Sequence, residues 1–204
     1  MKKVISGART SYIQLFSSIV KENHRKLVSL DLRAKKIRQE LIKAKGEDNK
    51  IALEKEINLT DAEIARLSLI TIVFSAMVIE AYIYDYAARH LGDAFVKDHL
   101  DKLDMLSKWI IIPKLITGNE LSRHQKWYTL LKNLIKTRNS VIHHKSSEPP
   151  ASPFEIEKYL NKLSESEGSI HEVAKQSIIL LDILADKIIE IDPEETPWVK
   201  SYLA

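Results

Sequence analysis

Apolar residues recur along most of this chain at the three- and four-residue spacing of an α-helix. Nowhere do apolar and polar residues alternate, as in a half-buried strand, for more than a few positions. Only five glycines and six prolines interrupt 204 residues, of which 45% are hydrophobic, a composition typical of a soluble globular protein with a large core. The sequence therefore predicts an all-α fold, an antiparallel up-and-down helical bundle with a charged N-terminal helical extension.

The chain is expected to divide into three parts. Residues 1–60 should form an N-terminal helix and a charged helical arm packed on the bundle, and the first helix of the arm should end at Gly46. Residues 61–192 should form the helical core, and residues 193–204 a loosely packed tail. An ordinary solvated helix face also carries such charges, so they do not by themselves identify a binding surface.

Two capping boxes precede apolar runs, Thr60 with Glu63 and Ser169 with Glu172. In this motif the hydroxyl and the carboxylate bond reciprocally to free N–H groups of the first helical turn. The pattern predicts that one core helix begins at each box.

A short amphipathic helix should bend or end near Pro113, because proline lacks the backbone N–H and clashes with the preceding turn. Ser122 is expected to open the next helix, which should run to about residue 143. A proline-rich loop at 146–153 follows it.

Several classes of protein are disfavoured by what the chain lacks. It has no cysteine, which excludes disulfides and thiol catalysis and favours the reducing cytoplasm. The most apolar segment, 67–79, is shorter than the roughly 20 residues that a membrane span needs. Histidines outside the 143–144 pair lack the spacing of metal motifs, and no phosphate-binding glycine loop occurs. We therefore expect no membrane span, no metal and no cofactor.

Two charged residues occupy unexpected places on the helical wheel. Arg138 falls in the middle of the apolar stripe of its helix, and Glu80 falls at the centre of an apolar face of the helix at 61–91. Burying either charge alone costs several kcal/mol. We therefore expect the two to pair in the core and to leave other guanidinium N–H groups free for an anion. The alternative is a buried ion pair with a purely structural role.

Positive charge gathers around the same helix. Six basic residues and one acidic residue lie between 120 and 147, although the formal net charge of the whole chain is only +3. This local excess favours contact with a polyanion.

Arg138, Asn139 and His143 spell R-N-x-x-x-H at the end of this amphipathic helix. The motif resembles the signature of the higher eukaryotes and prokaryotes nucleotide-binding (HEPN) superfamily, in particular its small prokaryotic ribonucleases and toxins. The resemblance extends to EAYIYDYAARHLG at 80–92, which is similar to the second core helix of the family. LSKWIIIPKLITG at 106–118 is similar to the segment that precedes the motif helix.

The resemblance implies a HEPN-like helical core and metal-independent cleavage of RNA. In this reaction the 2′-hydroxyl attacks the adjacent phosphate and leaves a 2′,3′-cyclic phosphate. His143 would transfer the proton, because imidazole titrates near neutral pH. Arg138 would stabilise the charge of the reacting phosphate, and Asn139 would orient the imidazole or bind a phosphate oxygen.

HEPN proteins form dimers in which two motifs face each other, and one histidine cannot easily act as both acid and base in one turnover. The resemblance therefore implies a homodimer with a composite site. It also implies a cytoplasmic toxin or antiviral defence effector, restrained by an antitoxin or another regulatory protein. The arm at 25–60 is the expected contact for that partner.

Three further residues are expected to support the site. His144 can assist His143 or contact phosphate, and Lys145 stands where one HEPN toxin group carries a modifiable tyrosine. Lys108 can line the cleft, although a solvated helix end is the simpler interpretation. The alternative function is a catalytically inactive HEPN-like helical module that binds RNA, a nucleotide or a protein partner.

Overall fold

The computed structural model describes residues 12–143 and 153–203, and for 153–167 it describes the helical backbone alone. Within these residues the chain consists only of helices and their connections, which confirms the predicted all-α bundle. The elements are α1 (Ile13–Lys43), α2 (Glu47–Leu91), α3 (Asp93–Phe95), the π-helix η1 (Val96–Leu100), α4 (Met105–Thr117), α5 (Lys126–Ile142), α6 (Pro153–Ile191), the 3₁₀-helix η2 (Pro193–Glu195) and α7 (Thr196–Tyr202).

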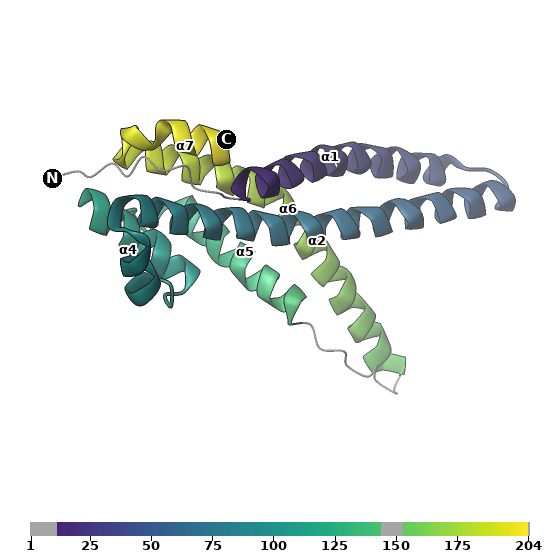
Figure 1. Cartoon of the computed structure of the whole chain (residues 1–204). Coiled ribbons are helices and arrows are strands. Elements are labelled where there is room, and N and C mark those ends of the chain that lie inside the picture. The colour runs from purple at the N-terminus through teal and green to yellow at the C-terminus, as the bar shows by residue number, and fades with distance from the viewer. Residues whose placement is uncertain (1–11, 144–152, 204) are drawn as a thin grey trace.

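The two helices α1 and α2 run antiparallel and project from the rest of the molecule as a long arm (Figure 1). Buried positions on α1 recur every three or four residues, as in a coiled coil, and include Ile13, Val20, Leu27 and Ala34. Gly46 begins α2 with a φ of 91°, a backbone conformation that favours glycine. The predicted end of the first arm helix near Gly46 is confirmed.

The predicted helix start at Thr60 is wrong, because α2 is continuous for 45 residues. Thr60 is buried, and its hydroxyl donates to the carbonyl oxygen of Glu56 within the helix. No glycine or proline interrupts residues 47–91, so nothing in the backbone requires a new start there. The expected division between arm and core therefore falls inside one helix.

The second predicted start, at Ser169, is also wrong. Residue 169 lies inside α6, and the Glu172 carboxylate accepts a hydrogen bond from Gln176 one turn further along. An interior glycine at 168 costs a helix only about 1 kcal/mol, which the packing of α6 outweighs.

Two smaller differences affect the helices before the motif. α4 continues through Pro113 and ends four residues later, before Gly118. α5 begins at Lys126 rather than at Ser122, whose carbonyl oxygen instead accepts a hydrogen bond from Trp127 Nε1 at 2.9 Å.

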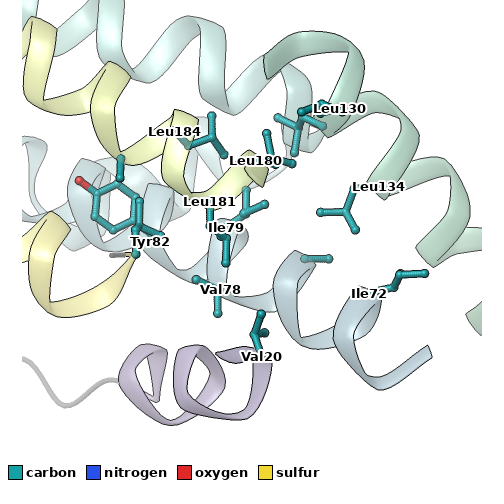
Figure 2. Packing of buried hydrophobic residues seen from close by; sticks show 14 of the residues in the cluster. Val20, Ile72, Val78, Ile79, Tyr82, Leu130, Leu134, Leu180, Leu181 and Leu184 are labelled. Carbon is teal, nitrogen blue, oxygen red and sulfur yellow. The ribbon is translucent and has the colours of Figure 1, made fainter. Parts of the chain in front are cut away.

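The hydrophobic core lies where α1, α2, α5 and α6 meet (Figure 2). Its central side chains come from all four helices and are Val20, Ile72, Val78, Ile79, Tyr82, Leu130, Leu134, Leu180, Leu181 and Leu184. This packing fixes α5, which carries the motif, against α2 and α6.

The predicted loose packing of the C-terminal tail is wrong. Residues 193–202 form η2 and α7, and Val199, Tyr202 and the following Leu203 are buried. These apolar side chains recur at helical spacing, so a short helix buries them together against the bundle.

By length and composition alone, α2 could cross a membrane. The most apolar stretch of α2 is 56% buried inside the molecule. Core helices of soluble proteins can have the same length and hydropathy as a membrane span. The length of α2 therefore does not distinguish a membrane span from a core helix.

Candidate functional site

The motif residues lie in the last turns of α5, on a helix anchored by a buried apolar face. Trp127, Leu130, Leu131 and Leu134 are buried at helical spacing and hold the first half of α5 on the bundle. The helix contains no acidic residue, so its charged side chains are all basic.

Arg138 is half-buried and has no carboxylate partner in the described part of the chain. Its Nη1 donates to Asn139 Oδ1 at 3.0 Å. Its Nε is buried and makes no hydrogen bond. The remaining N–H groups of the guanidinium meet no carboxylate among the described residues, and a guanidinium is suited to bind an oxyanion.

His143 is exposed and caps the C-terminal end of α5. Its backbone N–H donates to the Asn139 carbonyl oxygen at 3.0 Å, which completes the last helical turn. Asn139 is also exposed. The last turns of α5 therefore carry a guanidinium, an amide and an imidazole within six residues. On an ideal helix Asn139 and His143 lie about 40° apart, whereas Arg138 and His143 lie about 140° apart.

The predicted burial of Glu80 and its pairing with Arg138 are wrong. Glu80 is exposed, and no ion pair joins it to Arg138 among the described residues. The apolar side chains on the same face of α2 differ in burial, since Val73, Met77 and Tyr84 are half-buried whereas Ile83 and Ala87 are fully buried. The opposite face, which carries Val78 and Tyr82, is also fully buried in the core, and Glu80 lies at an exposed position between buried ones.

Lys108 is buried, so the interpretation as a solvated helix end is wrong. Its Nζ lies 3.3 Å from Asp101 Oδ1 and not against a residue of the motif. The neighbouring Trp109 is fully buried and stacks on Tyr82. His144 and Lys145 lie outside the described residues.

Sequence reasoning missed a second polar cluster at the end of α2. The Arg89 guanidinium bonds Glu195, which follows α6, and its Nε lies 2.9 Å from Asp85 Oδ2. His90 Nε2 lies 3.1 Å from Glu195 Oε1 and 3.8 Å from Asp192 Oδ2. Arg89 and His90 lie about a hundred residues from Glu195 in the chain, so no local pattern reveals these contacts.

Two tyrosine hydroxyls complete the cluster. Tyr86 donates to Asp192 Oδ2 at 3.0 Å, and Tyr82 lies 3.4 Å from Glu195 Oε2. Burial, reinforced by the nearby carboxylates, raises the pKa of both tyrosines far above 10. For Glu195, burial acts to raise the pKa, but hydrogen bonds from His90 and Arg89 outweigh it and hold the pKa below 4.5.

The fold and these side chains define an all-α helical bundle with two polar clusters, one at the end of α5 and one where α2 meets the C-terminal segment. No family model, curated protein or solved structure matches the chain.

Proposed function

We propose that the protein is a HEPN-type endoribonuclease that cleaves RNA without a metal ion. The observation that carries the proposal is the half-buried Arg138, which has a buried N–H without a partner and stands five residues before the exposed His143 at the end of the same helix. A phosphate in contact with this guanidinium would satisfy its free donors.

The chemistry assigns one role to each motif residue. An imidazole such as His143 removes the proton of the 2′-hydroxyl, whose oxygen then bonds to the adjacent phosphorus. The bond from phosphorus to the 5′-oxygen breaks, and a second imidazole returns a proton to that oxygen. The products are a 2′,3′-cyclic phosphate and a free 5′-hydroxyl. Arg138 stabilises the charge of the reacting phosphate, and Asn139 keeps the arginine in place through their hydrogen bond.

The second imidazole belongs to a second copy of the chain in this proposal. One exposed His143 per chain supplies one proton carrier, so two motifs facing each other across a two-fold axis make a complete site. The active form is then a homodimer that binds RNA in the cytoplasm.

Such a nuclease needs restraint, so we assign it the role of a toxin or an antiviral defence effector. The arm of α1 and α2 projects from the bundle and carries exposed apolar residues, among them Leu32, Ile42 and Leu59. An antitoxin or another regulatory protein would contact this arm.

The test compares the purified protein with His143→Ala on a labelled single-stranded RNA in the presence of EDTA. Wild-type protein should cleave the RNA and leave cyclic phosphate ends, whereas His143→Ala should lose at least a hundredfold in rate. The control is His124→Ala, which removes another exposed histidine just before α5 and should cleave at the wild-type rate.

Equal cleavage by His143→Ala and wild type would overturn the proposal. If wild type binds RNA but leaves it intact, the inactive RNA-binding module is the better assignment. Light scattering during gel filtration should show a dimer, and full activity in a monomer would contradict the composite site.

A further inference from the structure

A second polar site lies where α2 ends beside the C-terminal segment. His90 comes from α2, and Asp192 and Glu195 come from the residues that follow α6. One ligand atom from each of the three lies within 4.8 Å of the others. This set contains an imidazole as well as two carboxylates, and it is assembled only by the tertiary fold.

The spacing of the three donor atoms suits a transition-metal ion. Zinc binds imidazole nitrogen and carboxylate oxygen at about 2.0 to 2.2 Å, so neighbouring donors lie about 3 to 3.5 Å apart. His90 Nε2 lies 3.1 Å from Glu195 Oε1 and 3.8 Å from Asp192 Oδ2. Side-chain movements of less than about 1 Å would bring all three onto one ion.

The charges of the cluster leave one buried carboxylate without a permanent counter-charge. Arg89 balances Glu195, but Asp192 has no lysine or arginine partner in the described part of the chain. The Asp192 side chain is only 8% exposed, and among the described residues it contacts the Tyr86 hydroxyl and His90. A buried carboxylate without a permanent counter-charge is costly, and a bound cation would remove that cost.

Neighbouring side chains hold His90, Asp192 and Glu195 in place through hydrogen bonds and a ring contact. Tyr86 donates to Asp192, and its ring meets the His90 ring edge to face at 4.9 Å. Arg89 Nη2 donates to Glu195 Oε2 at 2.8 Å. Arg89 Nη1 also contacts Glu195 Oε1. That carboxylate oxygen has a second lone pair, which can bind a metal ion. Such hydrogen bonds fix the orientation of ligating carboxylates.

We propose that His90, Asp192 and Glu195 bind one divalent transition-metal ion of the zinc type. Three protein ligands leave a coordination position for water, and the His90 side chain, at 27% exposure, opens the site to solvent. The imidazole disfavours magnesium and calcium, which take oxygen ligands. The ion would join the end of α2 to the segment that leads into α7, and it has no part in the RNA chemistry.

The experiment measures zinc binding to the full chain, first stripped with a chelator that is then removed. Wild-type protein should bind one Zn²⁺ per chain at this site by calorimetry. At a zinc concentration about 100-fold above Kd, its melting temperature should rise by roughly 5 to 10 °C. Magnesium at the same concentration should have no effect. His90→Gln should lose this zinc binding, and Asp192→Asn should weaken it at least tenfold.

The control variant is His99→Ala, which removes an exposed histidine that packs on Phe95 outside the cluster. It should bind zinc as wild type does. Circular dichroism of the metal-free variants shows whether each is folded, and either His90→Gln or Asp192→Asn alone suffices for the comparison.

The proposal fails if wild type and His90→Gln bind zinc identically, since any zinc then occupies other histidines such as His143. It also fails if wild type binds none, because the cluster is then a network of ion pairs and hydrogen bonds. Ribonuclease activity in EDTA is measured separately, so failure of the zinc proposal does not contradict the proposed RNA cleavage, and the reverse also holds.

Discussion

Arg89 and Glu195 form a buried ion pair between the end of α2 and the segment that leads into α7. The two residues are separated by 106 positions in the chain, and their side chains are 8% and 4% exposed. Arg89 also lies over the Trp198 ring, at 4.7 Å from its centroid. This one side chain therefore holds both η2 and α7 against the bundle.

Replacing Arg89 with methionine should destabilise the protein by about 3 to 5 kcal/mol, because it leaves the buried Glu195 carboxylate without its cation. Urea unfolding followed by circular dichroism measures the change. Arg38→Met is the matched control, since the Arg38 pair with Asp61 is largely exposed and should contribute little. A similar small loss in both variants would show that the buried pair is not a main support of the C-terminal segment.

Stability should fall in acid, and Glu195 should contribute to that fall. Its pKa in the folded protein lies below the ordinary 4.5, so the unfolded chain takes up the proton first as the pH decreases. The stabilisation is present above about pH 4.5 and is lost as the pH falls through the folded pKa. Unfolding free energies from pH 7 to pH 3 should fall less steeply in Glu195→Gln. An unchanged slope would assign the acid sensitivity to other carboxylates.

Two acidic residues of α2 should respond differently to loss of charge. Asp85 is buried and accepts a bond from Arg89 Nε at 2.9 Å, so Asp85→Asn should cost about 1.5 to 3 kcal/mol. Glu80 is exposed, so Glu80→Gln should change the unfolding free energy by at most about 0.5 kcal/mol. A large loss in Glu80→Gln would support the rejected pairing with Arg138.

Arg138→Met should leave stability unchanged within about 0.5 kcal/mol, or raise it, because the guanidinium has no carboxylate partner in the described residues and one of its buried N–H groups is unbonded. The same variant should abolish RNA cleavage. Thermal unfolding and the RNA assay on one preparation test both statements. A marked loss of stability would indicate that Arg138 has a structural role instead.

The core of α6 should be sensitive at Leu184 and tolerant at Ile179. Leu184 is fully buried, and Leu184→Ala should cost about 2 to 5 kcal/mol through lost contacts and the cavity left behind. Ile179 is 45% exposed on the same helix, and Ile179→Ala should cost about 0.5 kcal/mol. Chemical denaturation distinguishes the two, and equal losses would contradict the packing in Figure 2.

Local patterns in the sequence determined the helical class, the buried face of α5 and several helix ends. The spacing of Trp127, Leu130 and Leu134 places them on one face of any helix. Gly46 and Gly92 adopt positive φ at helix boundaries, which few other residues do. The grouping of Arg138, Asn139 and His143 also follows from helical geometry alone.

Only the tertiary structure decided which face of α2 is buried and which distant residues meet. α2 carries apolar side chains on more than one face, so a wheel centred on Glu80 identified an apolar face but not which of its positions are covered: Ile83 and Ala87 are buried, and Glu80 is exposed. Thr60 and Ser169 fit a capping motif, yet packing keeps both helices continuous. The contacts of Arg89 and His90 with Glu195 depend on how α2, α6 and α7 pack, and the spacing of residues within one segment contains no information about that packing.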